Sequence, residues 1–126
     1  MPNHYFTVEE ANAALSVLRP IVAAMLTARG RIVAAQPDLW PVLEKAASNG
    51  GSDKASAVLV DFETVRRAAK TIERLGIELK DINTGLVDFL SERDGRDVYL
   101  CWRYDEPKVA FWHDLEAGFG GRQPLE

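Results

Sequence analysis

The spacing of the apolar residues changes at Gly76, and this change divides the chain into two kinds of structure. Before Gly76, apolar residues recur every three or four positions, which is the period of a helix packed along one face. After Gly76, β-branched and aromatic residues gather in short runs with a period near two, as in half-buried strands. Gly76 tolerates the left-handed conformation in which helices commonly end. The pattern therefore predicts an α+β fold, with helices first and a sheet second.

A capping box opens the first predicted helix. The Thr7 hydroxyl can accept a hydrogen bond from the amide of Glu10, whose carboxylate can reach back to the amide of Thr7. Pro20 lacks a donor and clashes with the preceding turn. The apolar seam continues in phase beyond Pro20, so we expect a kink rather than a break. The seam consists of Val8, Ala11, Leu15, Leu18, Val22, Met25 and Ile32.

A second long helix is predicted to begin at Asp53, which can act as its N-cap, and to end at Gly76. Between the two helices, residues 40–47 favour a short helical turn and residues 48–52 a flexible connection. Two helices with one seam each most simply pack as an antiparallel hairpin. The second seam consists of Val58, Phe62, Val65, Ala69 and Ile72.

Three runs after Gly76 are the best strand candidates, namely residues 86–90, 98–102 and 109–112, and residues 77–79 can begin another. Asp94-Gly95 is a strong hairpin signal, and residues 105–107 provide a second turn. We therefore predict a single domain over residues 1–126. A long antiparallel helical hairpin within residues 1–76, its first helix kinked at Pro20, packs on an antiparallel β-meander of three to four strands within residues 77–126.

Length, charge and cysteine content argue against several classes of protein. A chain of 126 residues can bury one sizeable core. The net charge of −4 opposes nucleic-acid binding, which depends on clustered Lys and Arg. The longest uninterrupted apolar run, residues 21–26, is far shorter than the roughly 20 residues of a membrane span. A single cysteine forms no internal disulfide, so we expect a cytoplasmic protein. From the charge and the short apolar runs, we expect neither a nucleic-acid nor a membrane partner.

The two predicted turns set an expected register for the sheet. The first hairpin pairs Val87 with Trp102, Asp88 with Cys101 and Phe89 with Leu100, and the second pairs Val98 with His113, Leu100 with Phe111 and Trp102 with Val109. The face expected to pack on the helices carries Val87, Phe89, Val98, Leu100, Trp102, Val109, Phe111 and His113. The opposite face carries Leu86, Asp88, Leu90, Tyr99, Cys101, Arg103, Lys108, Ala110 and Trp112.

This register separates three residues whose chemistry suits a metal site or a Cys/His nucleophile pair. Asp88 and Cys101 share one face, but His113 is expected on the other and cannot reach them. A slip of one residue in the second hairpin would bring the three together, because every side chain of the last strand would change face. Because His113 is expected on the other face, we expect Asp88 to pair with Arg103 or Lys108 and Cys101 to be half-buried.

His113 then has two interpretations. One is a core residue hydrogen-bonded to a carbonyl or carboxylate. The other pairs it with Glu116, three positions later on the same turn, either as two metal ligands or as a base oriented by the carboxylate. Asp114 or Glu106 could complete such a site. Arg122 is expected to be exposed beside it, because the glycine-rich turn at residues 118–121 should tuck Phe119 into the core.

The motifs along the chain resemble the bacterial domain-of-unknown-function 2203 family. The resemblance covers nearly the whole chain, although Leu90 stands where the family often has Pro and Asp105-Glu106 where a Gly-Glu turn is common. It implies a small free-standing cytoplasmic bacterial protein and no known activity, substrate or cofactor. The motifs are YFTVEEAN at residues 5–12, KD at 80–81, TGLVDF at 84–89, GR at 95–96, LCWR at 100–103, WHDLEAGF at 112–119 and GRQPL at 121–125.

Two kinds of function fit this sequence, and it specifies no reaction. The first is a non-enzymatic interaction module that forms a homo-oligomer through the helical seams or the mixed face of the sheet. That partner-facing surface would comprise Asp88, Tyr99, Cys101, Arg103 and Trp112. The alternative is a protein that binds a small ligand or a divalent metal, as a hydrolase would, around His113 and Glu116 with Asp114, Glu106 and Arg122 nearby.

Overall fold

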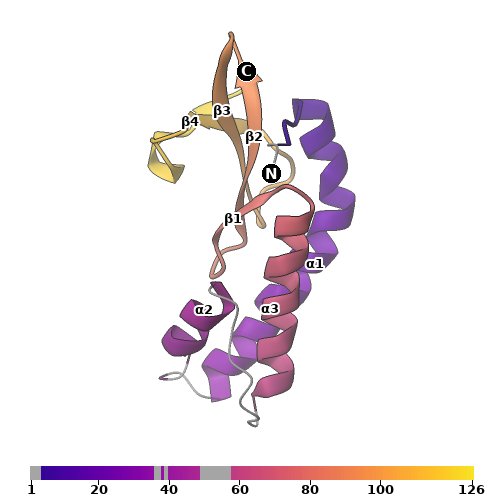
Figure 1. Cartoon of the computed structure of the whole chain (residues 1–126), viewed down its shortest axis with the longest axis vertical. Helices are drawn as coiled ribbons and strands as arrows, with labels where there is room; N and C mark the ends of the chain where they lie inside the picture. The colour runs from indigo at the N-terminus through magenta and orange to yellow at the C-terminus, as the bar shows by residue number, and fades with distance from the viewer. Residues whose placement is uncertain (1–3, 36–37, 39, 49–57) are drawn as a thin grey trace.

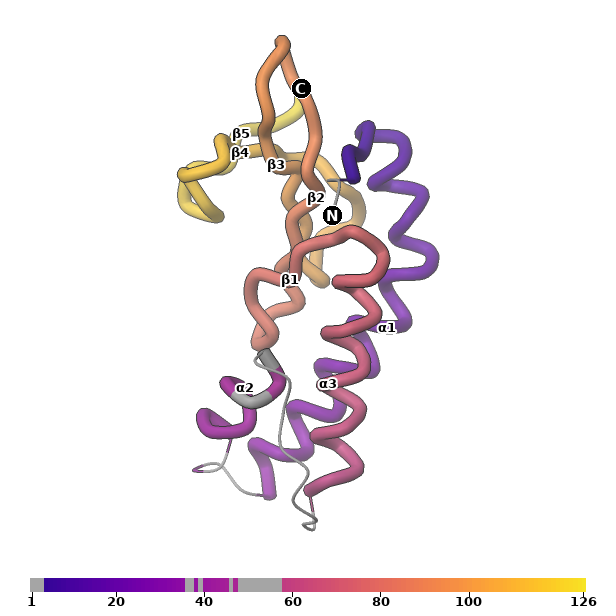
Figure 2. Tube along the Cα trace, viewed as in Figure 1, coloured from indigo at the N-terminus to yellow at the C-terminus, as the bar shows by residue number. Residues whose placement is uncertain are grey.

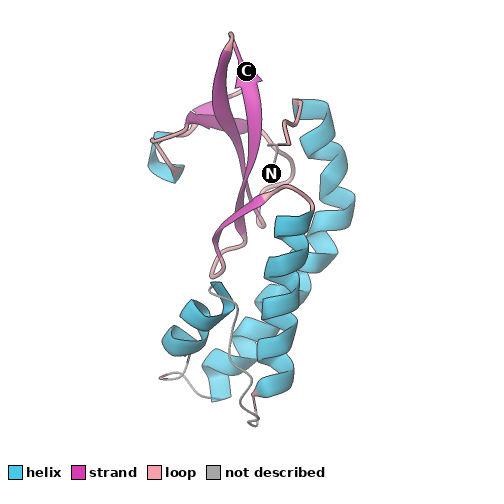
Figure 3. Cartoon of the chain, in the orientation of Figure 1, coloured by secondary structure: helices cyan, strands magenta, loops and turns pink. Residues whose placement is uncertain are grey.

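The computed structural model describes residues 4–35, 38, 40–48 and 58–126. Three helices precede the sheet: α1 (Val8–Ala35), α2 (Trp40–Ser48) and α3 (Leu59–Arg74) (Figure 1). The predicted α+β class is therefore confirmed, with helices first and strands second (Figure 3). The predicted cap at Asp53 lies outside the described residues.

Helix α1 begins at the predicted capping box. The amide of Thr7 donates to Glu10 Oε1 at 2.8 Å, and the amide of Glu10 donates to Thr7 Oγ1 at 3.0 Å. The helix continues through Pro20 without a break. Its buried residues follow the predicted seam with two differences: Ala28 is added between Met25 and Ile32, and Val8 is only partly buried. They are Ala11, Leu15, Leu18, Val22, Met25, Ala28 and Ile32.

By its length and mean hydropathy, α1 meets the criteria for a helix that could cross a membrane. The length of the uninterrupted apolar runs did not predict this, because scattered polar residues shorten each run but lower the mean hydropathy of the helix only slightly. The core helix of a soluble protein meets the same criteria. In this chain the apolar seam of α1 lies in one hydrophobic core with α3 and the sheet.

Helix α3 lies beside α1 and runs in the opposite direction, as the hairpin prediction requires (Figure 2). Its buried residues are Phe62, Val65, Ala68 and Ile72. Gly76 has a φ of 82°, and its amide donates to the carbonyl of Glu73 at 2.9 Å, so it ends the helix as predicted.

The sheet has five antiparallel strands, where we predicted three to four. They are β1 (Glu78–Asp81), β2 (Leu86–Arg93), β3 (Arg96–Arg103), β4 (Phe111–Asp114) and β5 (Gln123–Pro124), paired in chain order. The fifth strand forms because the chain returns after the short 3₁₀-helix η1 (Phe119–Gly121), so that the amide of Leu125 donates to the carbonyl of Ala110 at 2.9 Å. It is too short to carry a periodic signal.

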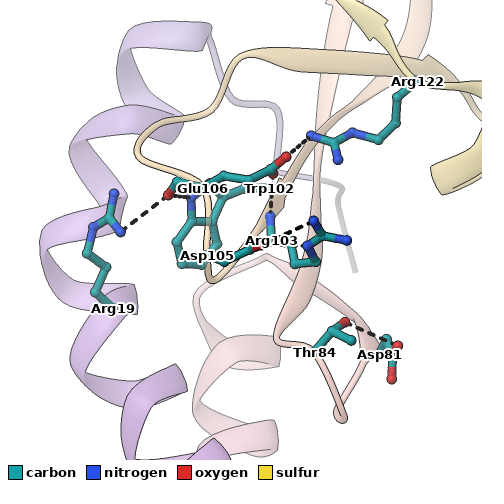
Figure 4. Close-up of polar contacts among 8 residues, drawn as sticks. All are labelled: Arg19, Asp81, Thr84, Trp102, Arg103, Asp105, Glu106 and Arg122. Carbon is teal, nitrogen blue, oxygen red and sulfur yellow. Dashed lines mark hydrogen bonds and ion pairs between the residues drawn. The ribbon is translucent and has the colours of Figure 1, made fainter.

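The turn between β1 and β2 fastens the sheet to α1. The Asp81 carboxylate accepts hydrogen bonds from the amide of Asn83 at 2.9 Å and from the Thr84 hydroxyl at 3.1 Å (Figure 4). Gly85 follows with a φ of 69°, and a Cβ atom there would lie 2.6 Å from Val22 Cγ1. Only glycine allows the turn to approach the helix so closely.

The predicted register of the β2–β3 hairpin is confirmed. Asp88 pairs with Cys101, Val87 with Trp102 and Phe89 with Leu100. The turn residues Asp94 and Gly95 have φ angles of 54° and 80°, as a two-residue hairpin loop with both central residues in the left-handed region requires.

The predicted register of the β3–β4 pair is wrong by one residue. Tyr99, not Val98, pairs with His113, and Leu100 pairs with Trp112. The reason lies in Asn12 on α1, whose side chain accepts from the amide of Val109 at 2.8 Å and donates to its carbonyl at 3.3 Å. Val109 is thereby bonded to the helix instead of the sheet, and β4 begins only at Phe111.

The slip exchanges the faces of the β4 residues. The face against α1 and α3, called here the helix-facing side, carries Val87, Phe89, Val98, Leu100, Trp102 and Trp112, all within the hydrophobic core. The opposite face, called here the outer face, carries Asp88, Tyr99, Cys101, Phe111 and His113. Our assignment of Phe111 and His113 to the core side and of Trp112 to the outer side was therefore wrong.

Candidate functional site

Three side chains with metal-ligating atoms meet at the centre of the outer face. Asp88 comes from β2, Cys101 from β3 and His113 from β4, and one ligand atom from each lies within 4.8 Å of the other two. All three residues are buried, with exposed fractions of 2%, 0% and 2%. Our reason for setting this cluster aside was a register that the structure contradicts. Cys101 is fully buried rather than half-buried, and Asp88 faces His113 rather than Arg103 or Lys108.

The hydrogen bonds of His113 determine which ring nitrogen carries the hydrogen and which one faces the cluster. Nδ1 lies 2.7 Å from the carbonyl oxygen of Asp114, and because a carbonyl only accepts, Nδ1 carries the hydrogen. In the neutral ring, Nε2 then has a lone pair and no hydrogen, and this nitrogen lies 3.1 Å from Asp88 Oδ2. Two acceptors at this distance need a proton or a cation between them.

Burial raises the pKa of the Asp88 carboxyl, although His113 and the Cys101 thiol act in the opposite direction. The second carboxylate oxygen, Oδ1, is buried and has no hydrogen-bond partner among the described residues. Burial and the neighbouring Asp88 raise the pKa of the Cys101 thiol to about 12, against the influence of Arg122. Without a cation, Cys101 is therefore a neutral thiol, and Asp88 has an unsatisfied oxygen beside it.

On the β1 side, a polar group borders this cluster. The Tyr99 hydroxyl donates to Glu78 Oε2 at 2.6 Å, and Glu78 also pairs with Lys80 at 3.0 Å. Burial and the bond to Glu78 raise the pKa of Tyr99 to about 12. The Tyr99 ring lies 5.6 Å from the His113 ring, centroid to centroid. Tyr99 therefore covers one side of His113 and is itself held by Glu78.

On the β5 side, the border is formed by Arg122. Its guanidinium lies 4.0 Å from the centroid of the Phe111 ring and 4.6 Å from that of Phe119, and Nη2 bonds Glu106 Oε2 at 2.6 Å (Figure 4). The side chain of Arg122 is only 10% exposed, whereas Phe119 is 41% exposed. This reverses our expectation that Phe119 would be tucked into the core and Arg122 exposed.

Glu106 joins Arg122 to the loop before β4. Its Oε1 accepts from the amide of Arg103 at 2.8 Å, and its backbone carbonyl accepts from Trp102 Nε1 at 3.0 Å and from Arg19 at 3.4 Å (Figure 4). The Arg103 guanidinium meanwhile bonds Asp105 at 2.6 Å. Glu106 therefore connects the outer face to α1 through the loop.

The predicted pairing of His113 with Glu116 is not the arrangement that the structure has. Both ring nitrogens of His113 bond other groups, and Glu116 lies exposed in the turn after β4. The Asp114 carboxylate pairs with Arg96 at 3.0 Å, while its carbonyl is what orients His113. Glu106 and Arg122 do meet, but with each other rather than with Glu116.

The predicted partner-facing surface is also altered. Asp88, Cys101 and Trp112 are buried, and Trp112 lies on the helix-facing side. Tyr99 and Arg103 remain half-buried on the outer face. Two residues that shape the site, Glu78 and Asn12, were not anticipated, because a lone carboxylate and a lone amide carry no spacing signal.

Comparison with known proteins adds the family and nothing about chemistry. No curated protein matches the chain, and no solved structure does. One family matches, described as "Uncharacterized conserved protein (DUF2203)", and the match spans residues 4–125. That range includes every strand and all three residues of the buried cluster. The chain therefore belongs to the DUF2203 family.

Proposed function

We propose that this protein binds a divalent transition-metal ion, with zinc the best fit, through Asp88 Oδ2, Cys101 Sγ and His113 Nε2. The observation that carries the proposal is the buried contact of 3.1 Å between Asp88 Oδ2 and the Nε2 lone pair of His113. A cation between these atoms removes the repulsion of two acceptors. It also gives the Cys101 thiol a reason to ionise in a site where burial alone opposes it.

The donor set and its dimensions suit zinc. Zinc binds imidazole nitrogen and carboxylate oxygen at about 2.0–2.2 Å and thiolate sulfur at about 2.3 Å, which separates tetrahedral ligand atoms by about 3.3–3.8 Å. The three ligand atoms lie within 4.8 Å of one another, so shifts of a few tenths of an ångström to about 1 Å bring them to these separations. One thiolate with one imidazole favours zinc over magnesium or calcium, which take oxygen ligands.

The surroundings support the same assignment. The bond from His113 Nδ1 to the Asp114 carbonyl fixes the ring and its tautomer, as the outer partner of a metal-binding histidine commonly does. Asp88 and Cys101 are a directly opposed pair in a regular part of the sheet, so their Cβ positions are fixed by the ladder. A site built on strands rather than loops holds its ligands closely in place.

The competing explanation is a metal-free pair of Asp88 and His113 that shares a proton. Such a pair satisfies Nε2 and one carboxylate oxygen, but it leaves Asp88 Oδ1 buried without a partner in the described residues. In such a pair the Cys101 thiol serves only as a neutral hydrogen-bonding neighbour of Asp88. The two explanations differ in whether the protein takes up zinc at all, and in whether Cys101 and His113 are needed for that uptake.

The test measures zinc uptake by elemental analysis and by calorimetric titration of the reduced protein. Wild type is expected to take up one zinc ion per chain, and Cys101→Ala and His113→Gln are each expected to lose at least about ten-fold in affinity. His4→Gln is the matched control, because His4 is the other histidine of the chain and lies exposed near the N-terminus. Absence of zinc uptake by wild type, or equal uptake by Cys101→Ala, contradicts the proposal.

Self-association through the outer face stays a prediction. The observations that favoured it are weaker than before, because Trp112 is buried on the helix-facing side. The cytoplasmic location also stays a prediction. It suits the proposal, since Cys101 must remain reduced to bind a metal.

A further inference from the structure

The positions of the three ligands define the direction of a fourth. Asp88, Cys101 and His113 come from three neighbouring strands and all project from the outer face. An ion held tetrahedrally by three such groups has its remaining position directed away from the sheet. Helices α1 and α3 lie on the helix-facing side (Figure 1), so this fourth position is on the opposite side of the sheet, where Tyr99 and Arg122 border the cluster.

One of those bordering side chains has unused hydrogen-bonding capacity. Arg122 bonds Glu106 through Nη2 alone, and its Nε is buried without a partner among the described residues. A guanidinium that is nine-tenths buried and offers a donor with nothing to bond is costly unless a ligand completes it. The aromatic rings of Phe111 and Phe119 hold it in place.

The strand pairing places Arg122 to one side of the proposed ion. Arg122 lies over Phe111, and Phe111 pairs directly with Cys101 on the neighbouring strand. Neighbouring strands are about 4.8 Å apart. A carboxylate or phosphate spans such a distance, with one oxygen about 2 Å from the ion and another about 2.8 Å from a guanidinium nitrogen.

We infer that the fourth position takes an oxygen of a small molecule bearing a carboxylate or phosphate group, whose second oxygen is bound by Arg122. This inference rests on the proposed metal site. Glu106 is the internal competitor, because its carboxylate already bonds Nη2 of the same guanidinium at 2.6 Å, and its negative charge repels an oxyanion that approaches the unpaired Nε. Oxyanion binding and the Glu106 contact therefore oppose each other.

Lys80, the cation on the opposite border, is less suited to this role. It is 40% exposed, pairs with Glu78 and lies over the Tyr99 ring. A solvated ammonium that already has a carboxylate partner gains little from a ligand. Arg122 differs in being buried, rigidly held and incompletely bonded.

The experiment uses the protein loaded with cobalt(II), whose visible absorption reports its coordination, and titrates it separately with acetate and with inorganic phosphate. We expect at least one of them to perturb the spectrum of the wild type at saturable concentrations. Arg122→Gln should weaken that binding by about ten-fold or more, and Glu106→Gln should tighten it, while both keep their affinity for cobalt. Arg31→Gln is the matched control, because Arg31 pairs with Asp61 between α1 and α3.

The outcomes separate this inference from the proposed metal site. Failure of cobalt and zinc to bind wild type overturns the metal site itself. Cobalt binding with a spectrum that neither acetate nor phosphate changes overturns only the oxyanion site, as does equal oxyanion affinity in Arg122→Gln and wild type. If Arg122→Gln does not fold, Arg122→Lys and Glu106→Gln decide: the lysine keeps the charge but lacks Nε, so weaker binding is expected there, and unchanged binding in both contradicts the inference.

Discussion

Both faces of the sheet contain buried residues, but of different kinds. On the helix-facing side, Trp102 and Phe89 are fully buried in the core, with Arg19 of α1 over the Trp102 ring and Phe6 against Phe89. On the outer face, the buried residues are Asp88, Cys101 and His113, bordered by the half-buried Tyr99 and Phe111. Burial of apolar groups stabilises a fold in itself, whereas burial of a carboxylate does so only when the group is neutralised. The outer face is therefore where the chain accepts a cost, which the proposed metal ion would remove.

The largest effect on stability is expected on the helix-facing side. Trp102→Ala removes a fully buried ring, its bond from Nε1 to the Glu106 carbonyl and its contact with Arg19. We expect a loss of about 3–5 kcal/mol in the free energy of unfolding, measured by urea denaturation. The loss should be the same with and without zinc. Val17→Ala is the control, because Val17 is 54% exposed on α1 and should change little.

The next effect tests the outer face. Asp88→Asn keeps a hydrogen bond, since the amide of the new side chain can donate to His113 Nε2, and it removes the buried charge. Because burial raises the pKa of Asp88, its carboxylate contributes less stability as the pH rises from acidic to neutral values, and the asparagine has no such dependence. We therefore expect the metal-free variant to be at least as stable as wild type at neutral pH.

In the presence of zinc, wild type should be more stable than Asp88→Asn. Wild type gains about 2.7 kcal/mol when free zinc is 100 times its dissociation constant, and Asp88→Asn should gain far less. Thermal unfolding of both proteins with zinc and with a chelator measures the difference. A metal-free Asp88→Asn that is several kcal/mol less stable than wild type would indicate a structural ion pair instead.

The two strand pairings that form these faces also differ in how well the sequence predicted them. The β2–β3 register follows from Asp94-Gly95, a local signal, so the pairing of Asp88 with Cys101 was predicted correctly. The β3–β4 register depends on Asn12, which bonds Val109 from 97 positions away. No periodicity within the strands reports such a contact. The fold class was therefore predictable from local patterns, and the convergence of His113 on the other two ligands was not.

A smaller effect is the pH dependence of zinc affinity. Zinc must displace the proton of Cys101, whose pKa burial raises to about 12, so affinity should rise by about ten-fold or more for each pH unit between about pH 6 and 8. Calorimetry in buffers of different ionisation enthalpy counts the protons released. An affinity independent of pH in this range is incompatible with Cys101 as a ligand.

The smallest effect concerns the border at Tyr99. Tyr99→Phe removes the hydroxyl that donates to Glu78 at 2.6 Å, while Glu78 keeps its pair with Lys80, so we expect a loss of only about 0.5–1.5 kcal/mol. The size of this loss should depend on pH in the alkaline range. Burial and Glu78 raise the pKa of Tyr99 to about 12, so its contribution is complete below the unfolded value of about 10 and disappears as the pH rises through 12.

Wild type and Tyr99→Phe should therefore converge in stability between about pH 10 and 12. Tyr5→Phe is the comparison variant, because the Tyr5 hydroxyl bonds Asp97 at the surface instead of Glu78. The bond to Asp97 also raises the pKa of Tyr5, so this exposed tyrosine should lose a smaller contribution over the same alkaline range. At neutral pH, Tyr99→Phe should also leave the number of bound zinc ions unchanged, since Tyr99 borders the site without supplying a ligand atom to it. Loss of zinc from this variant would extend the metal site to Tyr99 and Glu78, and the outer face would then contain one continuous polar centre instead of a three-residue cluster with a border.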